Sequence, residues 1–191
     1  IAQAIKDQNP DDVILVNVHV GGFANPGNGQ PDFRTSFGNA LANQSGLTGY
    51  PSGTVNRHIF SGSTTAMGRG QWANAANQIL QQESYVNIAG TASIDVVTKE
   101  LTVTVEVYYT GDSPEDTNKL NVALLQDNTL GPQTGGNMGN NYVHMHRLVH
   151  FLTGQWGEDI TSTTEGSFSE FTFTYTIPED YRNIAVELED L

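Results

Sequence analysis

The chain contains no cysteine and few basic residues. Without a thiol it forms no disulfide and holds no metal through thiolate ligands. It also carries out no thiol–disulfide exchange, because that exchange needs an attacking thiolate. Eight lysines and arginines stand against 21 aspartates and glutamates, which gives a net charge of −13 at pH 7. This charge repels the phosphates of nucleic acids and of anionic membranes, so we expect no nucleic acid among the partners.

Long hydrophobic runs are also missing, since none approaches the roughly 20 residues that span a bilayer. We therefore expect contact with a membrane only through an anchor outside this chain. The length of 191 residues permits one large domain or two small ones. The chain starts at Ile1 inside a helical pattern and ends at Leu191 inside a strand pattern, and we interpret it as an internal fragment or a processed product.

The first 82 residues alternate between helical and strand patterns, which predicts an α/β arrangement. The predicted elements are, in order, a helix ending at Asn9-Pro10, a strand over 13–20, a helix from Asp32 to Gly46, a strand over 54–60 and a helix over 72–80. The strand over 13–20 is apolar on both faces at its start. That pattern is typical of a strand buried in a parallel sheet.

Four polar side chains of this part are candidates for ligand binding. Asn17 and His19 lie near the C-terminal end of the first predicted strand, where open α/β sheets bind their ligands. Arg34 and Arg57 stand out because the chain has so few basic residues. We expect each arginine to pair with an acidic residue near this edge of the sheet, with anion binding as the secondary role.

From Tyr85 onward the hydrophobic pattern has a period of two, which predicts strands. The predicted strands cover residues 87–96, 101–107, 120–124, 171–175 and 184–188. Short strands separated by turns rich in Gly, Asn, Asp and Pro favour a β-sandwich. The change of period predicts two domains, residues 1–83 and 84–191.

Three of the five histidines, His144, His146 and His150, are two and four residues apart in a strand-like segment. Alternate strand residues point to the same face, so two of these histidines at i and i+2, His144 and His146, are candidate ligands for a shared Zn²⁺, Cu²⁺ or Ni²⁺ ion. No third or fourth ligand is evident from the sequence, and a solvated strand face or packing between domains explains the pattern better.

Acidic residues gather in two loops, at residues 7–12 and 111–118, and the second contains Asp112, Glu115 and Asp116. Their oxygens are candidate ligands for Ca²⁺, the only cofactor that the sequence suggests. Neither loop has the spacing of an EF-hand. Because Asp, Asn and Pro also form turns, ordinary turn structure explains the loops as well as a metal does.

Five segments, in this order, resemble the outer membrane protein 28 family of Gram-negative cell-envelope proteins. They read VNVHVGGFANP, PDFRTSFGN, GYPSGTVNR, NVALLQDNTLGPQ and YVHMHRLVHFLTGQWGEDI. The resemblance implies an α+β protein of two domains, a thioredoxin-like domain followed by an immunoglobulin-like sandwich. It also implies export to the periplasm or outer membrane, often with a lipid anchor.

The resemblance has gaps as well as matches. The first strand and cysteine-containing turn that precede the first helix in the family are missing here, so the thioredoxin-like domain is truncated. Tyr50 and Pro51 match the position of the cis-proline beside the thioredoxin active-site turn. We therefore predict a cis peptide between them and count both among the candidate binding residues.

Two functions follow from these expectations. The first is a non-enzymatic binding or adhesion module of the cell envelope, whose partner is a protein or a ligand on the envelope or a host surface. The alternative is a fragment of an exported thiol–disulfide oxidoreductase whose cysteines lie outside this chain. Sequence upstream of Ile1 distinguishes them, because the second hypothesis requires a C-x-x-C motif there.

Overall fold

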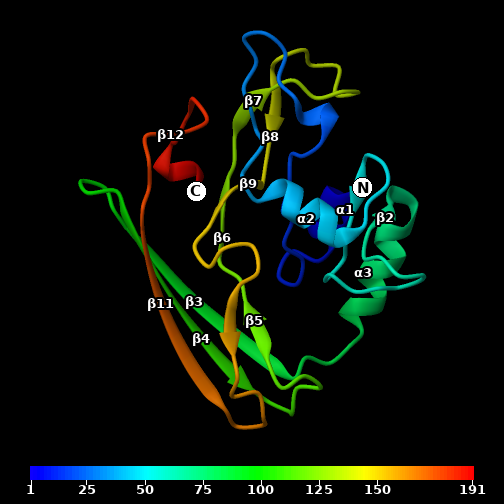
Figure 1. The fold of residues 1–191 in the computed structure, drawn as a ribbon, viewed down its shortest axis with the longest axis vertical. Helices are drawn as coiled ribbons and strands as arrows, with labels where there is room; N and C mark the ends of the chain where they lie inside the picture. Colours follow the sequence, from blue (N-terminus) through cyan, green and yellow to red (C-terminus); the bar gives the residue numbers. More distant parts are fainter.

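The computed structural model describes all residues, 1–191, as an α+β protein (Figure 1). The α-helices lie in the N-terminal part, and the long strands lie in the remainder. The elements before residue 82 are α1 (Ala2–Gln8), η1 (Gly22–Ala24), α2 (Gly38–Ser45), β1 (Ser52–Gly53), β2 (Met67–Gly68), η2 (Arg69–Gln71) and α3 (Trp72–Leu80).

The helices confirm the predictions that depended on periodicity. In α3 the apolar stripe buries Ala75 and Ala76, and the helix lies against α1. Helix α1 ends at Gln8, directly before Asn9-Pro10. Helix α2 ends at Gly46, whose φ of 68° is left-handed, a conformation that glycine adopts without a steric penalty.

A three-stranded antiparallel sheet forms the longest feature of the molecule (Figure 1). It consists of β3 (Val86–Asp95), β4 (Glu100–Tyr109) and β11 (Phe168–Thr176), with β4 in the middle. The turn between β3 and β4 is closed by Asp95, whose Oδ1 accepts the backbone N–H groups of Val97 and Thr98. Strands β4 and β11 confirm the two-residue alternation read from the sequence, whereas β3 is exposed along most of its length.

Shorter antiparallel pairs form a second layer on the inner face of this sheet. They are β5 (Asn118–Leu120) with β10 (Glu158–Ile160), and β6 (Ala123–Gln126) with β9 (Arg147–Phe151). Alternate residues of β4 face this layer, so Val105 and Val107 pack with Leu120 and Ile160 in one buried cluster. Burial of such side chains is the main stabilising contribution to this part of the fold.

Two further strand pairs and a 3-10 helix complete the chain near its upper end in Figure 1. They are β7 (Thr129–Gly131) with β8 (Tyr142–His144), β12 (Asp180–Tyr181) with β13 (Ile184–Ala185), and η3 (Leu188–Asp190). The predicted strands over 120–124 and 184–188 are therefore shorter or divided. No helix is long and apolar enough to cross a membrane.

The structure corrects three expectations for the N-terminal part. Residues 13–20 are extended but form only isolated bridges at Asn17 and His19, and Ile14 is 83% exposed rather than buried between layers. Residues 54–60 contain a turn instead of a strand. Asp32 does not cap a helix, because α2 begins six residues later and Asp32 binds arginines instead.

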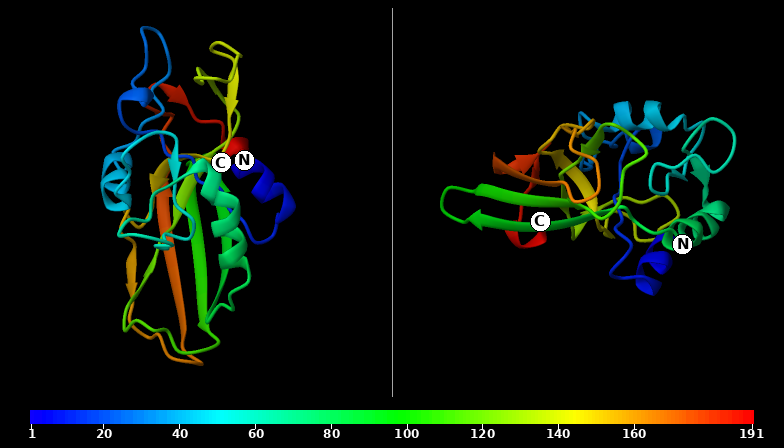
Figure 2. Two further views of the ribbon diagram at one scale, coloured as in Figure 1. Left: turned by 90° about the vertical axis from the view of Figure 1, so that its right-hand side faces the viewer. Right: turned by 90° about the horizontal axis from the view of Figure 1, so that it is seen from below.

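The extended segment joins the two parts of the chain (Figure 2). The backbone N–H of Asn17 donates to the carbonyl of His146 at 2.7 Å, and the N–H of Leu148 donates to the carbonyl of Asn17 at 3.0 Å. The side-chain amide of Asn17 donates to the carbonyl of Met145 at 2.7 Å. A short parallel contact thus places Asn17 beside Arg147 at the start of β9, and His19 forms its own parallel bridge with Arg34.

Candidate functional site: a polar groove at the junction

Two adjoining cavities lie where the N-terminal part meets the C-terminal turn. The first has a volume of about 330 Å³, and its lining includes His19, Arg34 and Arg182. The second has a volume of about 350 Å³ and includes Tyr50. Val20 and Asn39 line both, so we treat the two as one groove. It brings together His19 and Arg182, which are 163 positions apart in the sequence.

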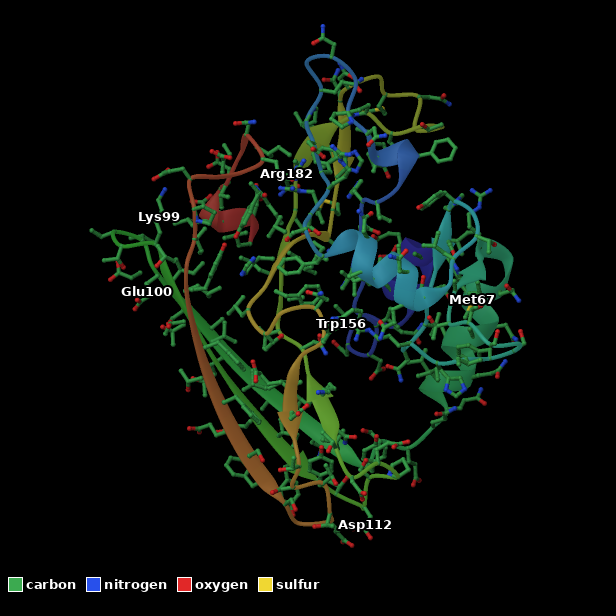
Figure 3. All side chains as sticks on the ribbon, in the orientation of Figure 1. Met67, Lys99, Glu100, Asp112, Trp156 and Arg182 are labelled. Carbon is green, nitrogen blue, oxygen red and sulfur yellow. The ribbon has the colours of Figure 1, made fainter.

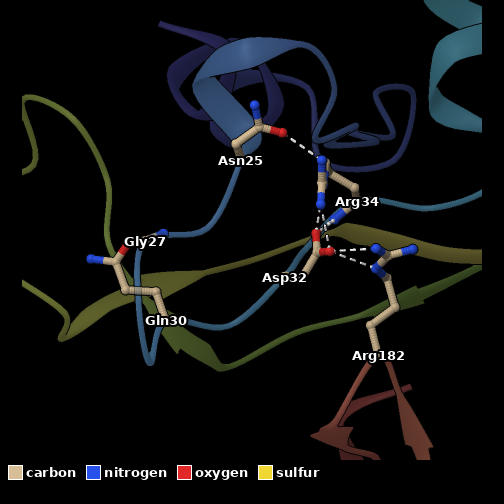
Figure 4. Close-up of polar contacts among 6 residues, drawn as sticks. All are labelled: Asn25, Gly27, Gln30, Asp32, Arg34 and Arg182. Carbon is tan, nitrogen blue, oxygen red and sulfur yellow. Dashed lines mark hydrogen bonds and ion pairs between the residues drawn. The ribbon is translucent and has the colours of Figure 1, made fainter.

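Asp32 fixes the two arginines of the groove (Figure 4). Arg34 donates from Nε to Oδ1 and from Nη2 to Oδ2, both at 2.8 Å, in a bidentate pair. Arg182, in the turn between β12 and β13, donates to Oδ2 from Nε at 2.8 Å and from Nη2 at 2.5 Å. The Arg34 hydrogen bonds are the largest cause that lowers the pKa of Asp32 below its ordinary value of 3.8. The carboxylate therefore stays charged and holds both guanidinium groups in place.

Several hydrogen-bonding groups of the groove have no partner within the protein. The Nδ1 of His19 and the Oγ1 of Thr35 are buried without a hydrogen bond. The Nη1 of Arg182 and the side-chain amide of Asn39 also make no hydrogen bond to the protein. Asn25 accepts a hydrogen bond from Arg34 through Oδ1 and leaves its Nδ2 free. Most buried polar groups are paired in proteins, so the two buried, unpaired atoms of His19 and Thr35 point to a ligand in the groove, and the exposed groups beside them are free to bind it.

The far end of the groove carries exposed aromatic rings. Tyr50 is 43% exposed and Phe23 is 81% exposed. Their ring centroids are 5.9 Å apart, in an edge-to-face arrangement. The Tyr50 hydroxyl lies over Gly21, where any Cβ would overlap it, and the φ of 75° at Gly21 also favours glycine. Gly21 thereby allows the tyrosine to close one side of the groove.

Behind the groove lies a buried cluster of aromatic and cationic side chains. The ring of His19 is 5.1 Å from those of Phe33 and His144, and Arg147 lies over Phe33 with its Cζ 5.4 Å from the ring centroid. Burial is the largest cause that lowers the pKa of His19 to about 4, and nearby His144 and Arg147 add to the effect. His19 is therefore neutral at pH 7 and offers hydrogen bonds, not charge, to the groove.

Of the predicted binding residues, the structure brings His19, Arg34 and Tyr50 together in the groove. Arg34 pairs with an acidic residue, as expected, but Arg57 is exposed and makes no ion pair. Asn17 serves the backbone junction described above. Pro51 forms the predicted cis peptide with Tyr50 and lines neither cavity.

The candidate metal ligands do not converge. No group of three or more His, Asp or Glu side chains is placed to hold a metal ion. His144 hydrogen-bonds the carbonyl of Pro132, His146 pairs with Asp127 at 3.3 Å, and His150 stacks on Tyr175. The Ca²⁺ suggestion stays a prediction from loop composition.

The acidic loop itself is exposed and serves as turn structure. Asp112 accepts the backbone N–H of Glu165 at 2.9 Å, whereas the side chains of Glu115 and Asp116 make no hydrogen bond. Figure 3 shows Asp112 and Arg182 at opposite ends of the molecule. The loop is therefore separate from the groove.

Four polar or charged residues of the first cavity were not singled out from the sequence: Asn25, Thr35, Asn39 and Arg182. Of these, only Arg182 could have been identified as a candidate from the sequence, because it is one of only eight basic residues. The amides and the hydroxyl belong to common surface types and have no spacing that marks them.

The structure thus combines an α+β fold with a polar groove at the junction of its two parts. A family model identifies the family. The model for outer membrane protein Omp28 matches residues 38–187, and the chain belongs to that family. The match contains three of the five resembling segments completely, and its description indicates the cell envelope. No curated protein and no solved structure matches the chain significantly.

Proposed function

We propose that this chain is a non-enzymatic binding module of the cell envelope and that the groove is its binding site. The observation that carries the proposal is the convergence of His19, Arg34, Tyr50 and Arg182 on one concave, polar surface. Its two guanidinium groups are held in place by ion pairs with Asp32. Preorganised donors lower the entropic cost of binding, as specific recognition requires. Membership of a family of outer membrane proteins supports the proposal that the partner lies on the envelope or on a host surface.

The proposal also includes the ancestry of the two parts. The order of helices and extended segments before residue 81 supports a degenerate thioredoxin-like domain, and the two strand layers after residue 85 support an immunoglobulin-like sandwich. An experimental structure of the full-length protein tests this. We expect residues 13–20 to pair there with an upstream strand in a central sheet. Finding those residues unpaired in the full-length protein would contradict the thioredoxin-like assignment.

Filling the groove is expected to abolish surface binding. Asn39 is exposed on α2 and lines both cavities, so Asn39→Trp places a large ring in the groove whatever the ligand is. We expect the wild-type chain to bind outer membrane vesicles or host epithelial cells saturably, and the variant to bind at least about ten-fold more weakly, a change of ~1.4 kcal/mol. Fluorescence of labelled protein on vesicles and cells measures this.

The matched control is Gln44→Trp, which changes an exposed residue of the same helix outside both cavities. It adds the same ring and should bind like the wild type. An absence of saturable binding by the wild type to either surface, or equal binding by both tryptophan variants, would argue against the groove as an adhesion site.

A further inference from the structure

The groove has the opposite charge to the rest of the molecule. Two of the chain's eight basic residues line it, and no acidic residue does, although the chain has 21. Asp32 neutralises one of the two guanidinium groups, so the local charge is about +1. A local charge of about +1, in a protein whose net charge is −13, favours a ligand with one negative charge. A phosphate monoester carries about −1.5 to −2 at pH 7 and matches less well.

The free donors have the arrangement that a carboxylate and neighbouring hydroxyl groups require. Arg182 keeps both N–H groups of Nη1 for a ligand, and Arg34 keeps one further N–H on each of its terminal nitrogens. Guanidinium groups bind planar carboxylates through paired hydrogen bonds. Asn25, Asn39 and Thr35 add amides and a hydroxyl, which both donate and accept, as sugar hydroxyl groups do.

The size of the groove exceeds that of a simple ion. Its first cavity of about 330 Å³ corresponds to roughly eleven waters at ~30 Å³ each. The second cavity continues from it past Val20 and Asn39 to Tyr50, beside the exposed ring of Phe23. Exposed aromatic rings present flat apolar faces, against which the C–H face of a sugar ring packs.

We propose that the groove binds an acidic saccharide, with its carboxylate at Arg182 and Arg34 and a neighbouring sugar ring against Tyr50. This inference rests on the proposed function and names the ligand of the same site. Uronic acids of bacterial envelopes and sialic acids of host surfaces share the required chemistry, which is one carboxylate on a polyhydroxylated ring.

Binding to an array of immobilised saccharides tests the proposal. The array carries uronate, sialate, sulfated, phosphorylated and neutral glycans, together with methyl esters of the carboxylated ones. We expect the purified chain to retain carboxylated glycans and to lose at least about ten-fold in affinity when the same glycan is esterified, because the ester removes the charge and keeps the shape. The uronate and sialate spots then distinguish an envelope source from a host source.

Variants connect the binding to the groove. Arg182→Gln should lose at least about ten-fold in affinity, and Arg182→Lys should lose less, because lysine keeps the charge but not the planar fork. Arg182 also holds Asp32, so Asn39→Ala provides a second variant that leaves the ion pairs intact and should weaken binding several-fold. Gln44→Ala, on the same helix outside the groove, is the control and should bind like the wild type. Circular dichroism checks that each variant is folded.

Three outcomes would overturn the proposal: equal retention of acids and esters, retention of sulfated or phosphorylated glycans alone, and no retention of any glycan. The vesicle and cell measurement separates this failure from that of the proposed function. If Asn39→Trp abolishes surface binding while no glycan is retained, the groove is a binding site whose ligand is not an acidic saccharide.

Discussion

Replacing Arg147 with alanine is expected to lower the free energy of unfolding by about 3–5 kcal/mol. The side chain is 1% exposed, which makes it one of the most completely buried in the protein. It lies over Phe33 and donates to the side-chain oxygen of Gln126, itself 3% exposed. Alanine would leave a cavity at the junction of the two parts and a buried acceptor without its donor.

Methionine at the same position should have a much smaller effect. Burial lowers the pKa of Arg147 from 12.5 to about 10, so the side chain remains charged at pH 7. No carboxylate pairs with it, and its Nε has no hydrogen bond. Arg147→Met keeps most of the volume and removes a buried, unpaired charge, so we expect a change within about 1.5 kcal/mol of the wild type in either direction.

Urea unfolding followed by circular dichroism measures both changes. The matched controls are Arg69→Ala and Arg69→Met, because Arg69 is exposed and forms no ion pair. Each control should stay within about 0.5 kcal/mol of the wild type. A loss for Arg147→Met as large as that for Arg147→Ala would show that the charge, and not the packed volume, stabilises the junction.

Local sequence patterns correctly predicted the elements that form through contacts between residues close together in the sequence. Helix α3 and the β3–β4 hairpin are set by the spacing of apolar residues and by a turn at Asp95, all within short stretches of sequence. The sequence resemblance also predicted the protein family, and the match to the family model confirms that prediction. These predictions needed no knowledge of which distant segments meet.

The errors arose where a distant partner decides the outcome. Residues 13–20 have a strand pattern, but whether such a segment enters a sheet depends on neighbours that sequence spacing does not identify. The expectation that His144, His146 and His150 share one strand face was wrong for a local reason. His146 has a φ of 55° between β8 and β9, so the strand is interrupted and residues two apart no longer share a face. His144 and His150 consequently pack against different aromatic rings.

The groove contains one contact between neighbours in the sequence and one between distant residues. Asp32 and Arg34 are two residues apart, and their pairing follows from proximity and charge. Arg182 reaches the same carboxylate from a separation of 150 residues, through a turn whose position depends on the whole strand arrangement. His19, Arg34 and Tyr50 were therefore visible as candidates in the sequence, whereas the concave shape of the site is a property of the fold alone.

Acid should destabilise the protein well above the pH at which carboxylates titrate, and His19 should be a principal cause. Burial lowers its pKa from 6.5 to about 4, and burial also lowers the pKa values of His144 and His150. Between pH 6.5 and 4 the unfolded chain therefore binds more protons than the folded one, and stability rises with pH. The contribution is complete above pH 6.5 and is lost as the pH falls towards 4.

The size of the effect follows from the shift at His19. Proton linkage gives at most about 2 kcal/mol of lost stability at pH 5, and partial exposure reduces this to ~1–2 kcal/mol. Asp32 contributes little in this window, because its pKa is 3.8 in the unfolded chain and lower still in the folded protein, so both values lie below pH 4. The pH dependence between 7 and 5 thus reports on the buried histidines.

Urea unfolding at pH 7 and pH 5 tests the assignment. His19→Gln removes the titrating group and keeps a polar side chain, so its stability should fall by about 1–2 kcal/mol less between the two pH values than that of the wild type. His58→Gln is the control, because His58 is exposed and lies outside the buried cluster, and it should follow the wild type. If the two variants show the same pH dependence, protonation of His19 is not linked to unfolding. The cluster behind the groove would then tolerate a charged imidazole, contrary to the burial that the structure shows.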